Sequence, residues 1–465
     1  MPRPSSQQAA APHKARSRSA DAMSHKQPRP SQRERLVRAM IELCAVSGYQ
    51  SISVAQVSAQ AKVSSATFYE QFANKEACLV AAYEFATARV LDGIGRVHRA
   101  SATTDEEWKQ LATKALESPL QAVKSDPEAG RLMFVEALAA GILLRAERQR
   151  VVERFEGYSQ ELLDSSPNAT IDLAPAAIIG ALRSICGRHL RTHSADTLPA
   201  LAPDLVAWVR SYSLPAEAAR WSTTRAALLP ASAAKRLYPP PVDTPGRLPR
   251  GRHGLSPAVV ARSQRTRIIH ATAETAMTKG YANTTVADIV ALAGISRDVF
   301  YEHFGDKQQA FLEAQQHPTQ FLLDACGTAY FAADSWPERV WRGLATLVGL
   351  IAANPALSYV RLVECYAAGP KAIRRAEEIS RSFGIFLEEG YALRDAPEEL
   401  PRLASQAITG AIFEIIQRSV ASGDTLTLSR QLPQLVYIAT APFIGAAEAR
   451  SQIERISLAA RTPQR

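Results

Sequence analysis

The sequence predicts an all-α protein made of two tandem copies of one helical unit. One pattern of residues occurs twice without gaps, 232 positions apart. Apolar residues recur at the i, i+3, i+4 spacing of amphipathic helices, and no segment shows a convincing strand-like alternation. A proline-rich stretch between the copies has the composition of an extended linker. We therefore expect two similar helical bodies in this chain of 465 residues.

The repeat is strongest near the start of each copy. Its matching positions are Gly48-Tyr49 and Gly280-Tyr281, Phe68-Tyr69-Glu70 and Phe300-Tyr301-Glu302, Phe72 and Phe304, and Lys75 and Lys307. Weaker matches follow further along, with an offset of 228 between Glu136 and Glu364 and of 230 between Gly180 and Gly410. The whole unit is therefore duplicated, and not only its first part.

The first copy begins with a succession of short helices. Leu36, Met40 and Leu43 belong to the apolar stripe of an amphipathic helix that stops at Gly48. Ser53 stands three residues before Gln56, which is the capping-box spacing at the start of a second helix. The hydroxyl of Ser64 caps a short third helix that ends near Phe72, and Asn74 caps a fourth.

The second copy repeats these elements. An apolar stripe that includes Ile269 and Ala276 forms the first helix, and Thr285, Ser296 and Asp306 cap the next three. The copies differ in the turn between helices two and three, where the second has Gly294 and the first has Lys62. A non-glycine residue in a left-handed turn costs about 1 kcal/mol, so we expect either slight strain or a different turn at Lys62.

Two short helices joined by a tight turn form a helix-turn-helix, whose second helix enters the major groove of DNA. The stretches VSSATFYEQFANKEACL (63–79) and ISRDVFYEHFGDKQQAF (295–311) resemble the recognition helix and the following helix of TetR-family bacterial repressors. The resemblance implies that each three-helix DNA-binding domain is followed by a helical ligand-binding and dimerisation domain. It further implies a sequence-specific DNA-binding regulator, by default a repressor, which binds a double-stranded DNA operator and a small-molecule effector of unknown identity.

The repeat and the resemblance together divide the chain into six segments. We expect a disordered basic arm over 1–30, a helix-turn-helix domain over 31–91, a helical effector and dimerisation domain over 92–228, a Pro- and Arg-rich linker over 229–262, a second helix-turn-helix domain over 263–323 and a second effector and dimerisation domain over 324–465.

The resemblance places one set of residues against the phosphate backbone of DNA: Ser53, Thr285, Tyr69, Tyr301, Gln71, His303, Lys75 and Lys307. Helix N-termini present free N–H groups and a positive dipole end to anions, and a lysine there adds a full charge. For the two tyrosines the alternative is half-buried packing. We favour contact with DNA, because neighbouring phenylalanines already supply the apolar anchors.

Base contacts are expected from the exposed first turn of the third helix, which begins after the capping serines Ser64 and Ser296. The first copy offers the small residues Ser65, Ala66 and Thr67, which suit close approach to a thymine methyl. The second offers Arg297 for guanine and Asp298 for cytosine. We therefore expect two unlike half-sites. Alternatively, Arg297 contacts only phosphate and Asp298 only favours the helix dipole.

Charge and composition suit this assignment. The net charge of +9 is concentrated in two basic arms, one before Pro30 and one from Arg247 to Arg267, which has six arginines and no acid. Such arms either bind a polyanion or are solvated tails. We expect no membrane span, no signal peptide and a cytoplasmic protein, which associates with the nucleoid when bound to DNA. The five scattered cysteines are expected to be buried, reduced thiols, with no metal site or cofactor.

The segments after each helix-turn-helix give less information. Residues that line a ligand pocket cannot be assigned, because large apolar residues at helical spacing usually belong to a core. Glu136 and Glu364 lie in apolar helices and are the first polar candidates; alternatively, they cap or hydrogen-bond a neighbouring helix. The tandem suggests either a homodimer or an intramolecular pseudodimer, in which 178–186 and 201–213 pack on 408–416 and 432–438.

Other classes of protein compete with a DNA-binding regulator, and an enzyme is the main one. The sequence contains none of the HExxH, P-loop, GxGxxG or GxSxG motifs, so we predict no enzyme and no catalytic residues. The alternative function is a helical small-molecule-binding or architectural protein in which one or both DNA-binding motifs are vestigial.

Overall fold

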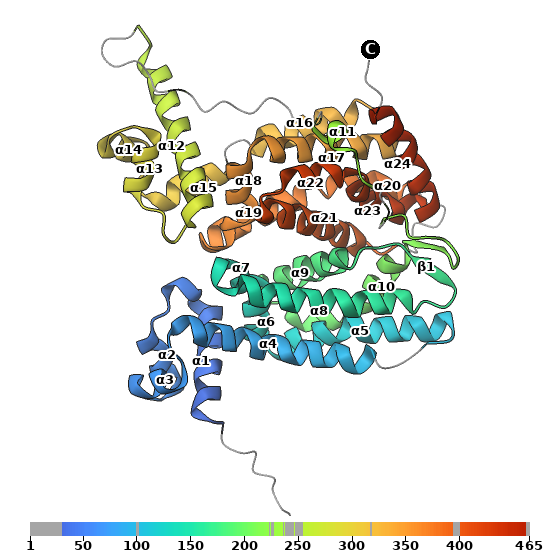
Figure 1. Ribbon diagram of the computed structural model, residues 1–465, viewed down its shortest axis with the longest axis horizontal. Helices are drawn as coiled ribbons and strands as arrows, with labels where there is room; N and C mark the ends of the chain where they lie inside the picture. Colours follow the sequence, from blue (N-terminus) through green and yellow to red (C-terminus); the bar gives the residue numbers. More distant parts are fainter. Residues whose placement is uncertain are drawn as a thin grey trace, which may run out of the picture.

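The structure, a computed structural model, describes residues 30–98, 102–222, 224, 227–235, 237, 246, 254–316, 319–393 and 400–461. These residues are almost entirely helical, which confirms the all-α prediction. Apart from Pro30, the basic arm expected over 1–30 lies outside them, as does most of 238–253 in the linker. Two helical bodies lie one above the other, and a small head projects from each at the same end of the molecule, on the left in Figure 1.

The first unit runs from Gln32 to Lys235. Its head contains α1 (Gln32–Ser47), η1 (Tyr49–Ser51), α2 (Val54–Ala61), α3 (Ser65–Gln71) and the start of α4 (Lys75–His98). Its body consists of α5 (Asp105–Ser125), α6 (Pro127–Arg131), η2 (Leu132–Glu136), α7 (Ala137–Ala139), η3 (Gly141–Leu144), α8 (Arg145–Asp164), β1 (Ala169–Ile171), α9 (Pro175–Arg191), η4 (Ala195–Leu201), α10 (Ala202–Arg210), β2 (Ser213–Pro215) and α11 (Ala231–Lys235).

The second unit repeats this order with differences. Its head contains α12 (Pro257–Lys279), α13 (Val286–Ala293), α14 (Arg297–His303) and α15 (Lys307–Gln316). Its body consists of α16 (Thr319–Phe331), α17 (Trp336–Ala353), α18 (Pro355–Leu362), η6 (Glu364–Tyr366), α19 (Pro370–Ser382), α20 (Ile385–Tyr391), α21 (Leu403–Ser422), α22 (Thr425–Arg430), α23 (Leu432–Ile444) and α24 (Ala446–Arg461).

Two features differ from the sequence prediction. Strands β1 and β2 pair antiparallel, with Ala169 opposite Pro215; three residues are too few to produce a recognisable alternation. The segment expected to be an extended linker over 229–262 is helical at both ends. Leu229 forms a backbone hydrogen bond to Arg430 of 2.8 Å, which anchors α11 on the second unit. At the other end α12 starts at Pro257, because Ser256 caps it and proline suits the first helical position.

The buried apolar residues show how the parts are joined. Each head has its own core, which includes Phe68 in the first and Phe300 in the second. The two bodies share one continuous core, extending from Trp108 in α5 to Ile453 in α24. The bodies therefore pack as a single unit, whereas each head is packed separately on its own side.

The contact between the bodies is centred on α9 and α21, which lie next to each other in Figure 1. A Cβ atom added to Gly180 would lie 2.6 Å from the carbonyl oxygen of Gly410, and one added to Gly410 would lie 2.8 Å from that of Gly180. These glycines are equivalent in the repeat, so the contact is reciprocal, as in a twofold dimer interface. Nearby, Tyr212 Oη donates to the carbonyl of Ile438 at 2.8 Å.

Charged groups also join the bodies. Glu414 of α21 is buried and lies 2.6 Å from Arg183 of α9 and 2.7 Å from Arg418. Burial opposes ionisation of Glu414, but the two arginines outweigh it and lower the pKa of the carboxyl group. Arg418 in turn lies 2.5 Å from Glu156 of the first unit. A buried charge with its partners in place favours one arrangement of the two units, because separating the partners would leave it unpaired.

Three further findings concern the described residues only. No single helix is long and apolar enough to cross a membrane, although α17 and α18 satisfy the criteria of length and composition as a pair across a 107° bend. All five cysteines are buried and unpaired, as predicted, and burial raises the pKa of Cys44 to about 12. No group of three or more potential metal ligands is found in the part of the chain that is described.

Candidate nucleic-acid interface

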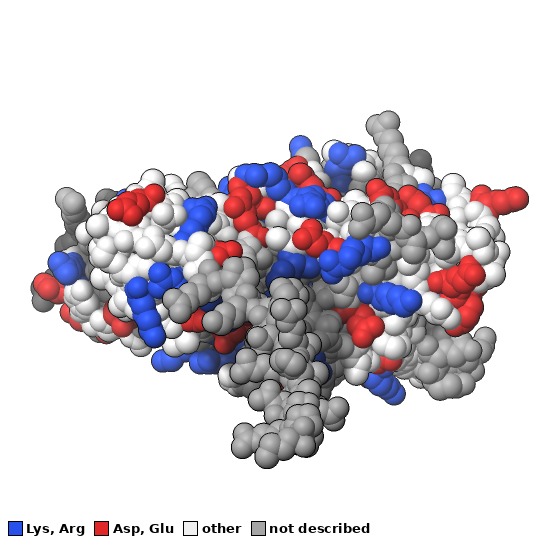
Figure 2. Space-filling model, turned by 90° about the horizontal axis from the view of Figure 1, so that it is seen from below, with Lys and Arg blue, Asp and Glu red and all other residues white. Residues whose placement is uncertain are grey.

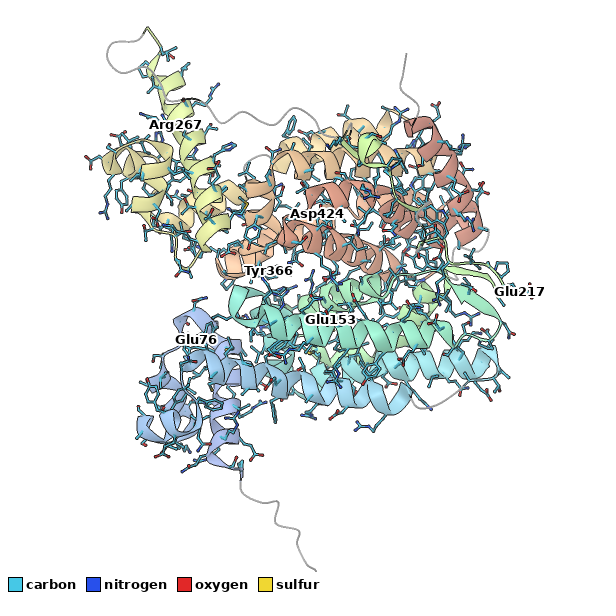
Figure 3. All side chains as sticks on the ribbon, viewed as in Figure 1. Glu76, Glu153, Glu217, Arg267, Tyr366 and Asp424 are labelled. Atoms are coloured by element: carbon cyan, nitrogen blue, oxygen red, sulfur yellow. The ribbon has the colours of Figure 1, made fainter. Side chains whose placement is uncertain are left out.

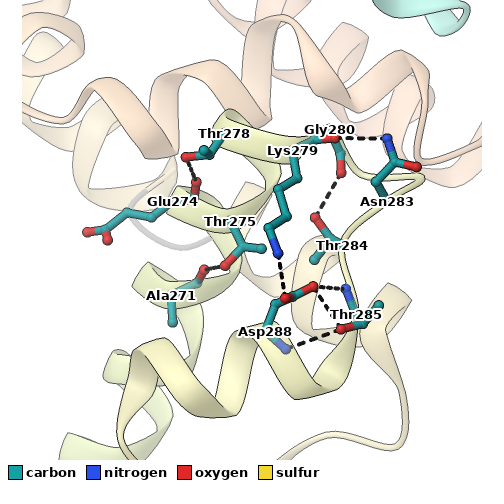
Figure 4. Close-up of polar contacts among 10 residues, drawn as sticks. All are labelled: Ala271, Glu274, Thr275, Thr278, Lys279, Gly280, Asn283, Thr284, Thr285 and Asp288. Carbon is teal, nitrogen blue, oxygen red and sulfur yellow. Dashed lines mark hydrogen bonds and ion pairs between the residues drawn. The ribbon is translucent and has the colours of Figure 1, made fainter.

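The second helix of each head begins with a capping box. Ser53 caps α2 together with Gln56, whose side chain accepts from the Ser53 N–H at 2.8 Å. Thr285 caps α13 together with Asp288, whose carboxylate accepts from the Thr285 N–H at 3.0 Å (Figure 4). Lys279 lies 2.6 Å from Asp288 and is the main cause of a lowered Asp288 pKa, to about 2. Both predicted hydroxyl caps are thus at helix N-termini, and both are exposed.

The turn between the second and third helices has the same conformation in both heads. Lys62 has φ 55° and ψ 49°, and Gly294 has φ 63° and ψ 44°. Both residues are therefore left-handed, so the turn does not change and the strain expected at Lys62 is present. An arginine of the first helix supports each turn. Arg35 donates to the carbonyl of Ala61 at 3.0 Å, and Arg267 donates to that of Gly294 at 3.0 Å.

The recognition helices α3 and α14 present one apolar face and one open face. Ser64 and Ser296 cap them by accepting from the N–H groups of Thr67 and Val299 at 3.0 Å and 3.3 Å. Phe68 and Phe300 point into the head cores and are fully buried. Of the residues predicted to contact bases, Thr67 is half-buried. The other four are exposed, namely Ser65, Ala66, Arg297 and Asp298.

The tyrosines next to these phenylalanines are on the open face. Tyr69 is 59% exposed and Tyr301 46%, so neither is a half-buried packing residue. Each ring meets its neighbouring phenylalanine edge-on and leaves its hydroxyl at the surface. In the second head, the guanidinium of Arg297 lies 3.5 Å from the Tyr301 hydroxyl. The helix thus presents an arginine and a phenol together, both able to donate to a phosphate or a base.

The lysines that open the fourth helices have partners within the protein. Lys75 Nζ donates to the carbonyl of Ile52 at 2.9 Å and lies 4.2 Å from the centre of the Tyr49 ring. Lys307 Nζ donates to the carbonyl of Tyr281 at 2.9 Å, and burial lowers its pKa. Both ammonium groups stabilise the turn that precedes helix two. They remain near a helix N-terminus, but their free donors are fewer than the resemblance implies.

Gln71 and His303, at the ends of the recognition helices, are half-buried. The carbonyl of Gln71 accepts from Arg33 at 3.0 Å, and that of His303 accepts from Arg265 at 3.3 Å. Burial and the nearby Arg265 charge lower the pKa of His303, so the neutral imidazole is favoured.

The arginines at the start of each head were not recognised from the sequence as structural residues. Arg33 covers the ring of Phe72 at 4.3 Å, and Arg265 covers that of Phe304 at 4.6 Å. Arg267 is buried. The sequence places Arg265 and Arg267 in a basic arm, but in the structure Arg265 holds the end of the recognition helix α14 and Arg267 holds the turn before it. Their spacing of 232 from Arg33 and Arg35 was a signal that could have revealed this role.

Each head is joined to its body through a buried glutamate. Glu364 Oε1 accepts from the Tyr281 N–H at 2.5 Å, just after the end of α12. Glu136 occupies the same place in the first unit, where its carboxylate accepts from the Tyr49 N–H and lies beside Gly48. Burial raises the pKa of both carboxyl groups. Of the two roles considered for these glutamates, the structure supports hydrogen bonding to a neighbouring element; they line none of the cavities described below.

Apolar cavities lie inside both bodies. One of about 80 Å³ in the first unit is bounded by Trp108, Leu116 and Leu182, and one of about 50 Å³ in the second by Tyr330, Leu347 and Phe386. Acidic and basic side chains are interspersed over the face of the molecule seen in Figure 2, so this face has no large area of one sign.

Two capped helix-turn-helices on a helical body define a DNA-binding transcription regulator. Residues 36–82 and 268–314 each match the family model for bacterial regulatory proteins of the tetR family. The chain belongs to the TetR family and carries two of its units in tandem.

Several solved structures resemble part of the chain. The fatty acid degradation regulator FadR from Bacillus halodurans is 16% identical, with 39% of this chain and 95% of that chain covered and a TM-score of 0.35. FadR from Bacillus subtilis, solved in complex with stearoyl-CoA, is 19% identical, with coverage of 38% and 96% and a TM-score of 0.34. A TetR-family regulator from Marinobacter aquaeolei is 17% identical, with coverage of 44% and 97% and a TM-score of 0.31. No curated protein sequence matches the chain.

Proposed function

We propose that this protein is a ligand-responsive transcriptional repressor whose two unlike heads bind one asymmetric operator. The observation that carries the proposal is the pair α3 and α14. Both helices have the same caps, turn and apolar face, but one presents Ser65 and Ala66 where the other presents Arg297 and Asp298. A shared scaffold with different exposed side chains suits binding of two different half-sites.

We further propose that the two units of one chain take the place of the two subunits of a dimer. The reciprocal contact between Gly180 and Gly410 and the continuous core of the two bodies support an intramolecular pseudodimer. Both heads project from the same end of this body (Figure 1), as two half-sites on one face of DNA require. The units of the proposal are the six segments given above, with the second head extended back to Pro257 by α12.

The exposure of each candidate residue decides which DNA contacts we propose. Ser53, Thr285, Tyr69 and Tyr301 are exposed and remain the best candidates for phosphate contacts. Gln71, His303, Lys75 and Lys307 are half-buried, and the side chains of the last three have internal partners. The contribution of these four residues to DNA binding is therefore expected to be smaller.

The test is selection of bound sequences from a random DNA pool, with the intact chain and one variant of each head. Ala66→Glu and Arg297→Glu place a negative charge in the first turn of the recognition helix, where the helix dipole tolerates it but DNA does not. Lys114→Glu, on the exposed side of α5, changes the net charge as much as Arg297→Glu and is the control.

The wild-type chain should select two unlike half-sites at a fixed spacing, and each head variant should lose one of them. Affinity should fall steeply with salt, and the control should behave like the wild type. A symmetric consensus would contradict the two-headed proposal. Absence of any sequence preference would indicate an architectural protein, and absence of DNA binding would indicate vestigial motifs. Sedimentation as a stable dimer would refute the pseudodimer.

A further inference from the structure

One cavity lies between the two units, not within either of them. Its volume is about 520 Å³, and it is lined by η2 and α9 of the first unit and by α18, η6, α19, α20 and α21 of the second. Tyr366, which lines it, is labelled in Figure 3 at the edge of the second body that faces the first. A cavity of this size is within the range of small-molecule sites.

The wall of this cavity is strongly basic. Two glutamates and six arginines line it: Glu377, Glu388, Arg183, Arg188, Arg191, Arg361, Arg381 and Arg402. Glu414 lies behind Arg183, and counting it as well still leaves the site with an excess of positive charge. The net sign of the site therefore favours an anion.

The arginines differ in their partners. Arg191 is paired with Glu377, and Arg402 with Glu388 at 3.0 Å. Arg361, which is only 6% exposed, donates to the backbone carbonyl of Gln315 at 3.2 Å. Burial lowers the pKa of this guanidinium to about 10, which indicates that its environment disfavours the charge. An anion beside Arg361 would offset that penalty.

Apolar surface accompanies the charge. Phe134, Leu362 and Phe413 form part of the lining. Phe413 and Thr409 also line the smaller apolar cavity in the second body, so the two spaces adjoin. The site is thus suited to a molecule with anionic groups at one end and an apolar body at the other.

The repeat shows that this cavity belongs to one side of the pseudodimer. The position equivalent to Arg361 in the first unit is Met133, at the offset of 228 that relates the two glutamates. The position equivalent to Arg183 in the second unit is Phe413, at the offset of 230 that relates the two glycines. A second basic cavity cannot be formed from these apolar counterparts, so the expected stoichiometry is one ligand per chain.

We propose that this cavity binds one organic anion per chain, an apolar or aromatic body carrying at least two negative charges on phosphate or carboxylate groups. The regulatory part of this inference rests on the proposed function; the binding part does not. Arg361 and Tyr366 line the cavity, and Glu364, in the same η6 turn as Tyr366, holds the N–H of Tyr281 in the second head. Phe134 lines the cavity from η2, and Glu136 of the same turn holds the N–H of Tyr49 in the first head. A ligand here therefore contacts the supporting turn of each head.

Calorimetry on the full chain without DNA tests the binding. The probes are 1-naphthyl phosphate and 2,6-naphthalenedicarboxylate, with neutral 1-naphthol as the comparison. At least one of the two anions should bind at one molecule per chain, more weakly as salt is raised, and the neutral probe should bind less well. Preference between the anions distinguishes phosphate from carboxylate recognition. Failure of both anions to bind at about 1 mM overturns the proposal, as does equal binding of the neutral probe.

Variants locate the site. Arg361→Met introduces the residue of the equivalent position and should weaken anion binding about tenfold or more. The double variant Arg188→Gln and Arg381→Gln changes two exposed residues that line the cavity. It tests the same site if Arg361→Met does not fold, and it should also weaken anion binding. Arg154→Gln, exposed on α8, is the control and should bind like the wild type. Unchanged anion binding in a folded cavity variant overturns the assignment of the binding site to this cavity. Because DNA selection is a separate measurement, this site and the proposed function can fail independently.

Discussion

Replacing Gly180 by alanine is expected to force α9 and α21 apart. The new Cβ would lie 2.5 Å from the Cβ of Glu414, 2.6 Å from the carbonyl oxygen of Gly410 and 2.9 Å from the Cα of Ala411. Carbon atoms in contact are normally about 3.5–4.0 Å apart, so the helices must separate by about 1 Å. Two of these atoms belong to the backbone and cannot rotate away.

Two opposing effects determine how much Gly180→Ala changes the free energy of unfolding. Overpacking of this kind costs about 1–3 kcal/mol. Alanine in a helix interior regains about 0.5–1 kcal/mol relative to glycine. Gly157→Ala, on the exposed side of α8, changes only the helix propensity, because nothing lies within 4 Å of its Cβ position. We therefore expect Gly157→Ala to stabilise the protein and Gly180→Ala to destabilise it, with a difference of about 1–3 kcal/mol.

The assay is urea unfolding followed by circular dichroism, with amide hydrogen exchange in α9 and α21 as the local measure. Gly180→Ala should lower the unfolding midpoint and speed exchange in both helices, whereas Gly157→Ala should raise the midpoint and leave that exchange unchanged. If Gly180→Ala stabilised the protein as much as Gly157→Ala, the contact between the units would not exist in solution, and the intramolecular pseudodimer would be refuted.

Three further predictions follow from the heads. Lys62→Gly should relieve the left-handed strain and raise the free energy of unfolding by up to about 1 kcal/mol, while Gly294→Lys should lower it by a similar amount; equal midpoints for both variants and the wild type would contradict this. Burial raises the pKa of Glu364, so its contribution to stability is present at low pH and is lost as pH rises through the folded-state pKa. Glu364→Gln should therefore stabilise the protein more at pH 8 than at pH 5. If the unfolding midpoints of the variant and the wild type differed by the same amount at both pH values, this would argue against a buried, ionised Glu364. Tyr301→Phe should weaken operator binding severalfold in a mobility shift without moving the unfolding midpoint, because the hydroxyl is at the surface; an unchanged affinity would exclude a phosphate contact there.

The heads were predicted well because their signals are local. A capping serine or threonine, such as Ser53 or Thr285, determines the start of a helix within four residues. The match of Lys62 with Gly294 left two conformations of the turn open, and the structure has the left-handed one. Lys75 was harder, since the resemblance suggests a phosphate contact and only the fold shows that the carbonyl of Ile52 is within reach. The role of Arg35 also depends on a residue 26 positions away.

The bodies were predicted less completely because their contacts are distant in sequence. The matching of Gly180 with Gly410 could be found by alignment of the two copies, but not the fact that they touch. The cavity between the units combines residues from η2 and α9 with residues from five elements that lie more than 160 residues further along the chain. No local pattern distinguishes Arg361 from an ordinary surface arginine on an amphipathic helix. Such a site becomes visible only when the two units are placed together.

Each head is connected to the shared body through a turn that also lines the basic cavity. In the second unit, Tyr366 of η6 lines the cavity, and Glu364 of the same turn accepts from the Tyr281 N–H. In the first unit, Phe134 of η2 lines the cavity, and Glu136 of the same turn accepts from the Tyr49 N–H. A ligand in the cavity therefore contacts the supporting turns of both heads, and a shift of either turn changes the position of the attached head relative to the body.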